Sequence, residues 1–456
     1  MIKKTTLLLT ILFTISLSVS AEGQDRDRNF RIILRHVYEH NPSLEAARAE
    51  LDTVSELYPQ ALSGWRPSLK IESDIYSTNV ESSNFGQTDG ATTREVKFSV
   101  DQPIFRGGQT FAKTKKANSL IRAGYAVMLQ SEQEIFLKAI SAIADVVRDR
   151  TLISLRTDNE KLMIEELHAV RARIEGGELT KTDEKQAETR LARSVSEKIA
   201  AQAHLESSVA RFEETIGYLP PDNMVFPDLI FIFPESQKEM ISLAEQGNPA
   251  IQSARHKSFA ADHEIDAVFR ELMPQIHAFA SYNKQYDPQP GIIDESEVQT
   301  IGVRASLLLY QGGNTRSRVR EAKKIANKRV IEIAEIKRRI RQQIISNRNK
   351  LEAAKSEISS RSIEVEAAEL AREGVRTEAQ LGERTVLDIL DADQELLDAQ
   401  AALIAAKRDE VVRHYTLAAD MGMLLPEKMG IARIDLAASE NSYAGDSLFS
   451  MNTDAE

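Results

Sequence analysis

The chain of 456 residues contains no cysteine and only one tryptophan. The absence of cysteine excludes disulfides, thiolate metal sites and a lipidated N-terminal cysteine. The 58 Lys and Arg residues are outnumbered by 69 Asp and Glu residues, so the formal net charge is -11 and non-specific nucleic-acid binding is not expected. After the first 21 residues, no apolar run reaches the ~20 residues that a membrane-spanning helix needs. If the mature chain enters a membrane, we therefore expect it to do so as β-strands.

Residues 1–21 have the pattern of a secretory signal peptide. Lys3 and Lys4 form a basic start, residues 7–19 are mostly apolar, and Val19-Ser20-Ala21 offers small residues at a cleavage site. The alternative is an uncleaved membrane anchor, for which the apolar stretch is short. We therefore expect the chain to be exported.

One short motif occurs twice. Residues 105–110 read FRGGQT, and residues 310–315 read YQGGNT. Apolar and polar residues alternate before each copy, and a long run of helix-forming residues follows it. This change of period predicts a strand that turns into a helix, at glycines that tolerate unusual backbone conformations. The four glycines of these two predicted turns are Gly107, Gly108, Gly312 and Gly313.

The motif is part of a duplication of nearly the whole chain. Gly107 and Gly312 are 205 residues apart, and so are Gly177 and Gly382. In each half, the sequence pattern predicts a helix, two strands and a long helical hairpin, with Gly177 or Gly382 at the hairpin tip. The predicted segments are a signal peptide (1–21), a first repeat (22–221), a proline-broken linker (222–236), a second repeat (237–426) and a polar, largely disordered tail (427–456).

The helical runs are unusually long. No proline interrupts residues 109–175, and a return helix is predicted over 181–216. In the last helix, apolar pairs recur every seven residues from 389–390 onward, which is typical of coiled-coil packing. An ordinary helical bundle would explain this heptad pattern equally well, but it would not explain the strands.

Four strands are predicted, near residues 65–76, 94–104, 274–283 and 298–308, with polar loops at 77–93 and 284–297. Four strands cannot close on themselves in lipid, because open edges leave backbone groups unpaired. Three copies would supply twelve strands, an even number of the kind seen in outer-membrane barrels. The predicted fold is therefore mainly α with a small β part, assembled as a trimer.

The sequence resembles the TolC-like outer-membrane channels of efflux pumps and type I secretion systems. The resemblance covers about residues 30–426 and rests on residues 102–108 (QPIFRGG), 309–315 (LYQGGNT) and 382–392 (GERTVLDILDA). It implies a homotrimer in the lipid of the outer membrane of a Gram-negative bacterium. It also implies a twelve-stranded β-barrel that continues into a twelve-helix α-barrel in the periplasm.

The same resemblance implies a function and partners. The channel would passively export small molecules (drugs) or proteins, and it would work with a periplasmic adaptor protein and an inner-membrane transporter of the ABC, RND or MFS type. No cofactor, metal or enzymatic activity is expected.

A periplasmic gate at the hairpin tips is implied as well. Arg384, just after the tip glycine Gly382, matches the family's gating arginine, and Asp388 and Asp391 match its two rings of lumen-facing aspartates. Three copies of these acids around a narrow axis would favour cations and raise some carboxylate pKa values. The alternative is that they only solvate a coiled-coil face.

On the first hairpin, Thr182 and Asp183 match the residues that receive the gating contacts, so we expect Arg384 to link to one of them. The best-known members place a tyrosine three residues before the tip glycine. This chain has Ala379 there, so a second, tyrosine-mediated link is expected to be missing.

Two other functions fit parts of the sequence. Residues 36–40 (HVYEH) match the H-x-x-E-H pattern of some zinc peptidases, but Asn41-Pro42 follows at once and no third ligand stands out nearby. A periplasmic adaptor would also have a long helical hairpin. Adaptors usually carry one hairpin between all-β domains, whereas this chain predicts two hairpins with paired strands in each half.

Overall fold

The computed structural model describes residues 29–82, 86–289 and 293–433. The predicted signal peptide and residues 434–456 of the predicted tail lie outside the described residues. The chain divides into two compact units. The first, here called the hairpin unit, takes the chain up to Arg48, Met128–Ile251 and the chain from Ile336; the second, the sheet unit, takes Ala49–Val127 and Gln252–Glu335. Each unit therefore contains residues from both sequence repeats.

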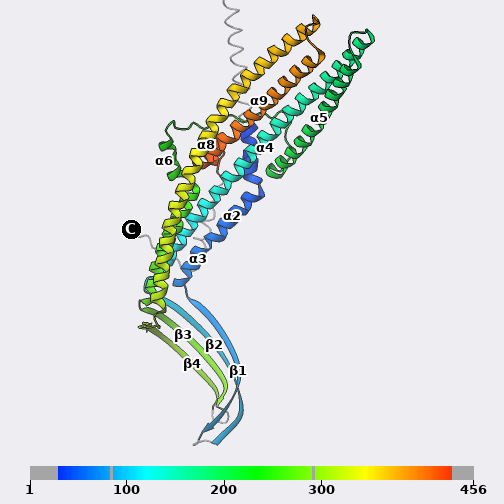
Figure 1. Ribbon diagram of the computed structural model, residues 1–456. Coiled ribbons are helices and arrows are strands. Elements are labelled where there is room, and N and C mark those ends of the chain that lie inside the picture. The colour runs from blue at the N-terminus through cyan, green and yellow to red at the C-terminus, as the bar shows by residue number, and fades with distance from the viewer. Residues whose placement is uncertain (1–28, 83–85, 290–292, 434–456) are drawn as a thin grey trace, which may run out of the picture. The chain divides into compact units, whose positions relative to one another are not determined.

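The sheet unit contains one antiparallel sheet whose strands follow chain order, β1-β2-β3-β4 (Figure 1). The strands are β1 (Ser68–Ser82), β2 (Gly86–Arg106), β3 (Gln275–Gln289) and β4 (Ile293–Ser306). β1 and β2 form the hairpin of the first repeat, and β3 and β4 form that of the second. Since β2 also pairs with β3, the two repeats share a continuous sheet.

The strands are longer than the sequence predicted, and the predicted loops at 77–93 and 284–297 are wrong for most of their length. β1 continues to Ser82 and β2 begins at Gly86, while β3 and β4 extend over most of 284–297. Ladder hydrogen bonds between neighbouring strands satisfy the backbone of a polar stretch as well as that of an apolar one. Polar composition was therefore a poor reason to end the strands early.

The long helices form two antiparallel hairpins. The first is α4 (Gln109–Glu175) with α5 (Lys181–Ile216), and the second is α8 (Asn314–Gln380) with α9 (Val386–Asp420). The predicted bounds of the first hairpin are confirmed. The predicted mainly helical fold with a small β part is confirmed as well. Among the described residues, no helix is both long and apolar enough to cross a membrane.

The glycine pairs lie where strand gives way to helix. Gly107, Gly108, Gly312 and Gly313 all have positive φ angles, between 59° and 81°. At Gly107, an added Cβ would lie 2.3 Å from the Cβ of Met273. This turn therefore needs glycine both for its backbone conformation and for the close approach of the second repeat.

The remaining helices are shorter. They are a helix over 29–40, α2 (Pro42–Ser55), α3 (Leu57–Leu62), α6 (Gln237–Gly247), α7 (Pro249–Phe269) and the 3₁₀ turns η1 (Ser63–Trp65), η2 (Arg270–Leu272) and η3 (Pro426–Met429).

Two buried asparagines, Asn41 and Asn248, join short helices to long ones in the same way. The Asn41 Oδ1 atom accepts the backbone N–H of Ser43 at 2.9 Å at the start of α2, while its Nδ2 donates to the Thr215 carbonyl of α5 at 2.7 Å. Asn248 repeats both contacts, at 3.0 Å to the backbone N–H of Ala250 and at 2.8 Å to the carbonyl of Asp420. Each asparagine thus caps one helix and binds the end of another.

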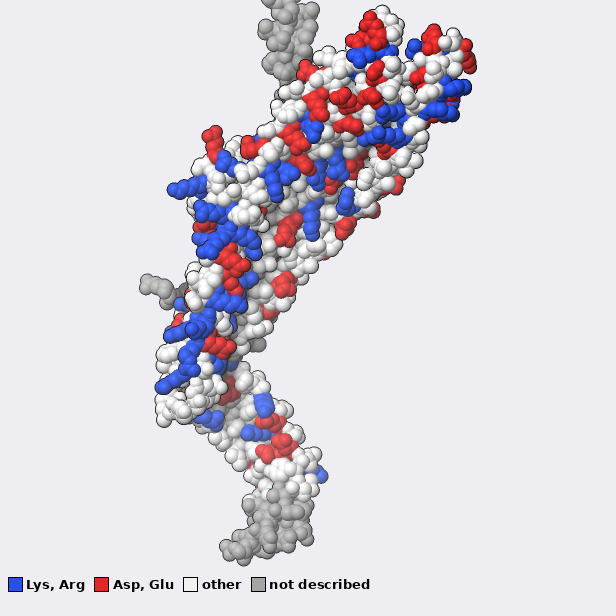
Figure 2. Space-filling view, in the orientation of Figure 1, with Lys and Arg blue, Asp and Glu red and all other residues white. Residues whose placement is uncertain are grey.

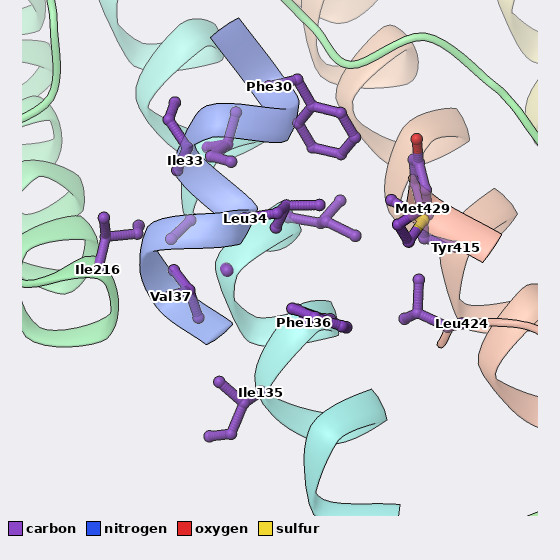
Figure 3. Packing of buried hydrophobic residues seen from close by; sticks show 14 of the residues in the cluster. Phe30, Ile33, Leu34, Val37, Ile135, Phe136, Ile216, Tyr415, Leu424 and Met429 are labelled. Carbon is purple, nitrogen blue, oxygen red and sulfur yellow. The ribbon is translucent and has the colours of Figure 1, made fainter. Parts of the chain in front are cut away.

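The main core of the hairpin unit gathers the helix over 29–40, α4, α5, α9 and the chain after α9 (Figure 3). The linker also packs here: Phe231 is buried, its backbone N–H donates to Nε2 of His414, and the Tyr415 hydroxyl donates to the Asp228 carbonyl at 2.6 Å. Met429 and Ile431 are buried in this core. The predicted tail therefore does not begin at 427, because its first residues pack.

Candidate functional site

Each hairpin tip is a tight glycine turn. Gly177 has φ 78° and Gly382 has φ 82°, and a Cβ added at either position would have no atom of the described chain within 4 Å outside its own turn. The backbone N–H of Glu178 donates to the Arg173 carbonyl at 2.9 Å, and that of Glu383 donates to the Glu378 carbonyl at 3.0 Å. These bonds close the last turns of α4 and α8 by the left-handed glycine motif. The two tips therefore have the same geometry.

Each return helix begins with a capping box. Oδ2 of Asp183 accepts the backbone N–H of Thr180 at 2.8 Å, and Oδ2 of Asp388 accepts that of Thr385 at 2.8 Å. In return, each threonine hydroxyl accepts the backbone N–H of its aspartate. The hydrogen bonds from the threonines hold the pKa values of Asp183 and Asp388 below the usual aspartate value.

This local role was missed at the sequence level, although its signal was present. Thr180-Lys181-Thr182-Asp183 and Thr385-Val386-Leu387-Asp388 both follow the pattern in which a threonine and an acid three residues later start a helix.

Arg384 contacts its own tip. Its Nε donates to Oε2 of Glu378 at 2.8 Å, so in the described chain Arg384 pairs with Glu378 and not with Thr182 or Asp183. Thr182 is exposed, and Ala379 is buried beneath the second tip. Since Glu378 and Arg384 flank Gly382, their ion pair braces one turn and does not join the two hairpins.

Other ion pairs do join the hairpins. Arg190 of α5 donates to Asp391 of α9, and Nη2 of Arg376 in α8 lies 3.0 Å from Oε1 of Glu166 in α4. Arg376 also lies 3.4 Å from Asp393, whose side chain is almost fully buried. The prediction had placed Asp391 in a lumen-facing ring. The structure gives it a cationic partner in the other hairpin, which offsets part of its charge.

An apolar cluster supports these ion pairs near the tips. It contains the buried residues Met163, Leu167, Val170, Ala187, Val386 and Leu390, from α4, α5 and α9. Tip contacts between the hairpins are therefore apolar at the centre and ionic around it. Ion pairs that are partly exposed contribute only about 0–1 kcal/mol each, so the buried apolar cluster supplies most of the free energy that holds the hairpins together here.

The histidine motif does not form a metal centre. His36 stacks on His40 with ring centroids 4.5 Å apart, and its edge meets Tyr218. In the part of the chain that the structure describes, no group of three or more His, Asp or Glu side chains is placed to hold a metal ion.

A single sheet built from two strand pairs, together with two long helical hairpins, is also the fold of outer-membrane channels of known structure. The structure of the Campylobacter jejuni outer membrane channel CmeC aligns with a TM-score of 0.74 at 12% identity, over 87% of this chain and 86% of that one.

The sequence comparisons identify the family. The family model described as "Outer membrane efflux protein" matches residues 33–218 and 240–422. The chain is 30% identical over 395 residues to the outer membrane efflux protein BepC of Brucella suis, covering 86% of this chain and 85% of BepC. It is 22% identical over 433 residues to TolC of Escherichia coli, covering 91% of this chain and 86% of TolC. The chain belongs to the outer membrane efflux protein family. It is thus an outer-membrane protein, in a family of channels and not of enzymes.

Proposed function

We propose that three copies of this chain form one passive channel-tunnel that exports small molecules, such as drugs, or proteins. The observation that carries this proposal is the sheet, in which β1 and β4 each have one edge that pairs with no other described strand. Several apolar side chains on these edge strands are exposed: Leu69, Ile71, Ile75, Ile301 and Val303. Open edges are not stable in lipid. Three copies supply twelve strands, enough for a closed sheet that leaves no edge.

The proposed partners follow from what a conduit requires. A passive channel needs an energy source, and we assign this role to an inner-membrane transporter of the ABC, RND or MFS type, connected through a periplasmic adaptor. BepC is named for efflux, which favours small molecules as cargo, with protein export as the second candidate.

We assign the gate to the hairpin tips. Gly177 and Gly382 form the turns, and the candidate gate residues are Thr182, Asp183, Arg384, Asp388 and Asp391. In this proposal, the pair of Asp391 with Arg190 and the brace of Arg384 on Glu378 hold the resting state. Separation of the hairpins breaks the first of these contacts and widens the passage.

The test is the native mass of the protein extracted from membranes in detergent, followed by conductance in planar lipid bilayers. A mass of three copies and discrete conductance steps are expected. A monomer or dimer that is soluble without detergent would refute the channel and favour the periplasmic adaptor function. A trimer without conductance would leave the assembly intact but refute the open tunnel.

A further inference from the structure

The sheet unit contains a pocket of about 390 Å³ near the start of α4. This volume lies within the range of small-molecule sites, about 300–1,000 Å³. Three helices line the pocket at positions i, i+3 and i+4, counted from Leu57 in α3, Lys113 in α4 and Glu264 in α7. Residues at this spacing share one face of a helix, so each of the three helices turns one face toward the same space.

The buried part of the pocket wall is apolar. Ala117 of α4 and Ala267 of α7 both line it and are only 4% and 2% exposed. The other apolar lining residues are Leu57, Ala61, Leu120 and Val268. Alanines on two of the helices leave open a space that larger side chains would fill. An aliphatic chain in this space would be removed from water together with the wall.

Charged side chains surround the apolar wall. Nζ of Lys116 lies 2.8 Å from Oε2 of Glu264, and Nη1 of Arg318 in α8 lies 2.6 Å from Oε2 of Glu271. Each acid that lines the pocket is therefore paired with a base. Lys113 differs, because in the part of the chain that the structure describes its ammonium forms no ion pair and no hydrogen bond. The pocket thus carries one uncompensated positive charge.

The surroundings of Lys113 are themselves positive. Partial burial lowers the pKa of Lys113, and the guanidinium of Arg106 at the end of β2 adds to this effect. The Nε atom of Arg106 is buried and has no hydrogen-bond partner in the described chain. Residues 314–329 of α8 contain seven Lys or Arg residues and one acid, and Figure 2 shows blue atoms gathered along this stretch. Such a field attracts anions.

We propose that this pocket binds an amphiphile with one anionic head group, a phosphate or a carboxylate, and an aliphatic chain. The head group pairs with Lys113, and the chain lies against the alanines of α4 and α7. An inorganic anion would leave the apolar wall in water, and a neutral amphiphile would leave Lys113 unpaired. All the lining residues belong to one chain, so the site is complete in a single copy and does not rest on the proposed trimer.

Dodecyl phosphate is the probe that tests this site, and dodecanol and inorganic phosphate represent its two halves. In a neutral maltoside detergent, native mass spectrometry should show one dodecyl phosphate per chain, bound more tightly than either half. Lys113→Gln should weaken the binding of dodecyl phosphate by about tenfold, since it removes a charge-assisted contact, and should leave dodecanol unaffected. Binding of dodecyl phosphate no tighter than that of dodecanol would overturn the anionic site.

Lys115→Gln is the matched control for the charge. Lys115 lies two residues further along α4, with Nζ 4.3 Å from the ring centroid of Phe111, and it does not line the pocket. This variant should bind dodecyl phosphate as the natural protein does. An equal loss of binding in both lysine variants would mean that net charge and not this pocket decides the affinity.

Ala61→Leu tests the apolar wall without changing a charge. The larger side chain narrows the pocket and should weaken the binding of dodecyl phosphate severalfold. Thermal unfolding in the same detergent verifies that each variant is folded. Equal binding to the natural protein, Lys113→Gln and Ala61→Leu would overturn the proposed site.

Two sources offer such an amphiphile, the lipid of the membrane and the solutes that pass through the proposed channel. An acidic lipid that co-purifies with the natural protein but not with Lys113→Gln identifies the membrane as the source. A conductance that dodecyl phosphate reduces in the natural protein but not in Lys113→Gln identifies a solute. If the protein does not conduct, the proposed channel fails and lipid co-purification decides. The absence of both effects would overturn the proposal, because neither source would then supply a ligand.

Discussion

Replacing Asn41 tests how the short helix α2 is fastened to the return helix α5. The side chain supplies two contacts, a cap on α2 and a hydrogen bond to the Thr215 carbonyl. Asn41→Ala removes both. Asn41→Ser keeps a hydroxyl that can cap the helix, but it is too short to reach Thr215. The two variants therefore separate the cap from the fastening.

The expected costs follow from these contacts. Loss of an N-cap destabilises a helix by about 1 kcal/mol, and loss of a hydrogen bond of this kind costs about 1 kcal/mol more. Asn41→Ala should therefore favour local opening by about 2 kcal/mol, roughly a 30-fold change in the opening equilibrium. Asn41→Ser should lose only about half of this free energy, roughly a fivefold change.

Hydrogen exchange of the Ser43 and Leu44 amides measures this opening directly. The equivalent joint at Asn248 is an internal control in the same molecule, and its amides should keep their protection. Equal exchange in the alanine and serine variants would mean that the cap contributes nothing. Unchanged exchange in both would refute the assignment of Asn41 as a fastening.

Three further predictions concern the tips and the core. Arg384→Ala or Asp183→Ala should raise the resting conductance in planar bilayers, because each removes a contact that orders a tip. The lowered pKa values of Asp183 and Asp388 mean that both caps are fully present above the usual aspartate range. Both caps are lost as the pH falls through those lowered pKa values. Hydrogen exchange of the backbone amides in the first turns of α5 and α9 should measure this loss. Burial lowers the pKa of His414 from 6.5 to about 4, so its contribution to stability is present above pH 6.5 and is lost as the pH falls toward 4. His414→Gln keeps an acceptor for the Phe231 N–H and should flatten this dependence in thermal unfolding.

Each of these predictions has a contrary outcome. Unchanged conductance in both tip variants would remove Arg384 and Asp183 from the gate. Asp388→Asn should abolish the acid-dependent exchange of α9 alone, and loss in α5 as well would contradict independent caps. A His414→Gln variant with the same pH profile as the natural protein would show that another group titrates.

The sequence predicted the structure best where residues close together in the chain decide the backbone conformation. The bounds of α4 and α5 follow from an uninterrupted helical run and the glycines after it, and these bounds agree with the structure. The strand ends did not follow, because ladder pairing between residues far apart in the chain overrides polar composition in 77–93. The capping boxes at Thr180 and Thr385 were readable in principle.

The contacts between the hairpins could not have been predicted in the same way. Arg190 and Asp391 are about 200 residues apart, and only the packing of α5 near α9 brings them together. Nor does the sequence show that Arg384 pairs with Glu378, because several acids lie within reach of so long a side chain.

The buried linker has a mechanical consequence. The contacts of Phe231 with His414 and of Asp228 with Tyr415 fix the connection between the repeats against α9. The linker therefore does not act as a flexible connection between the two repeats. Any displacement at Gly177 or Gly382 must be taken up as bending or twisting of the helices between the tips and these linker contacts. The length of helix between the linker contacts and the tips therefore determines how far the tips move for a given bend.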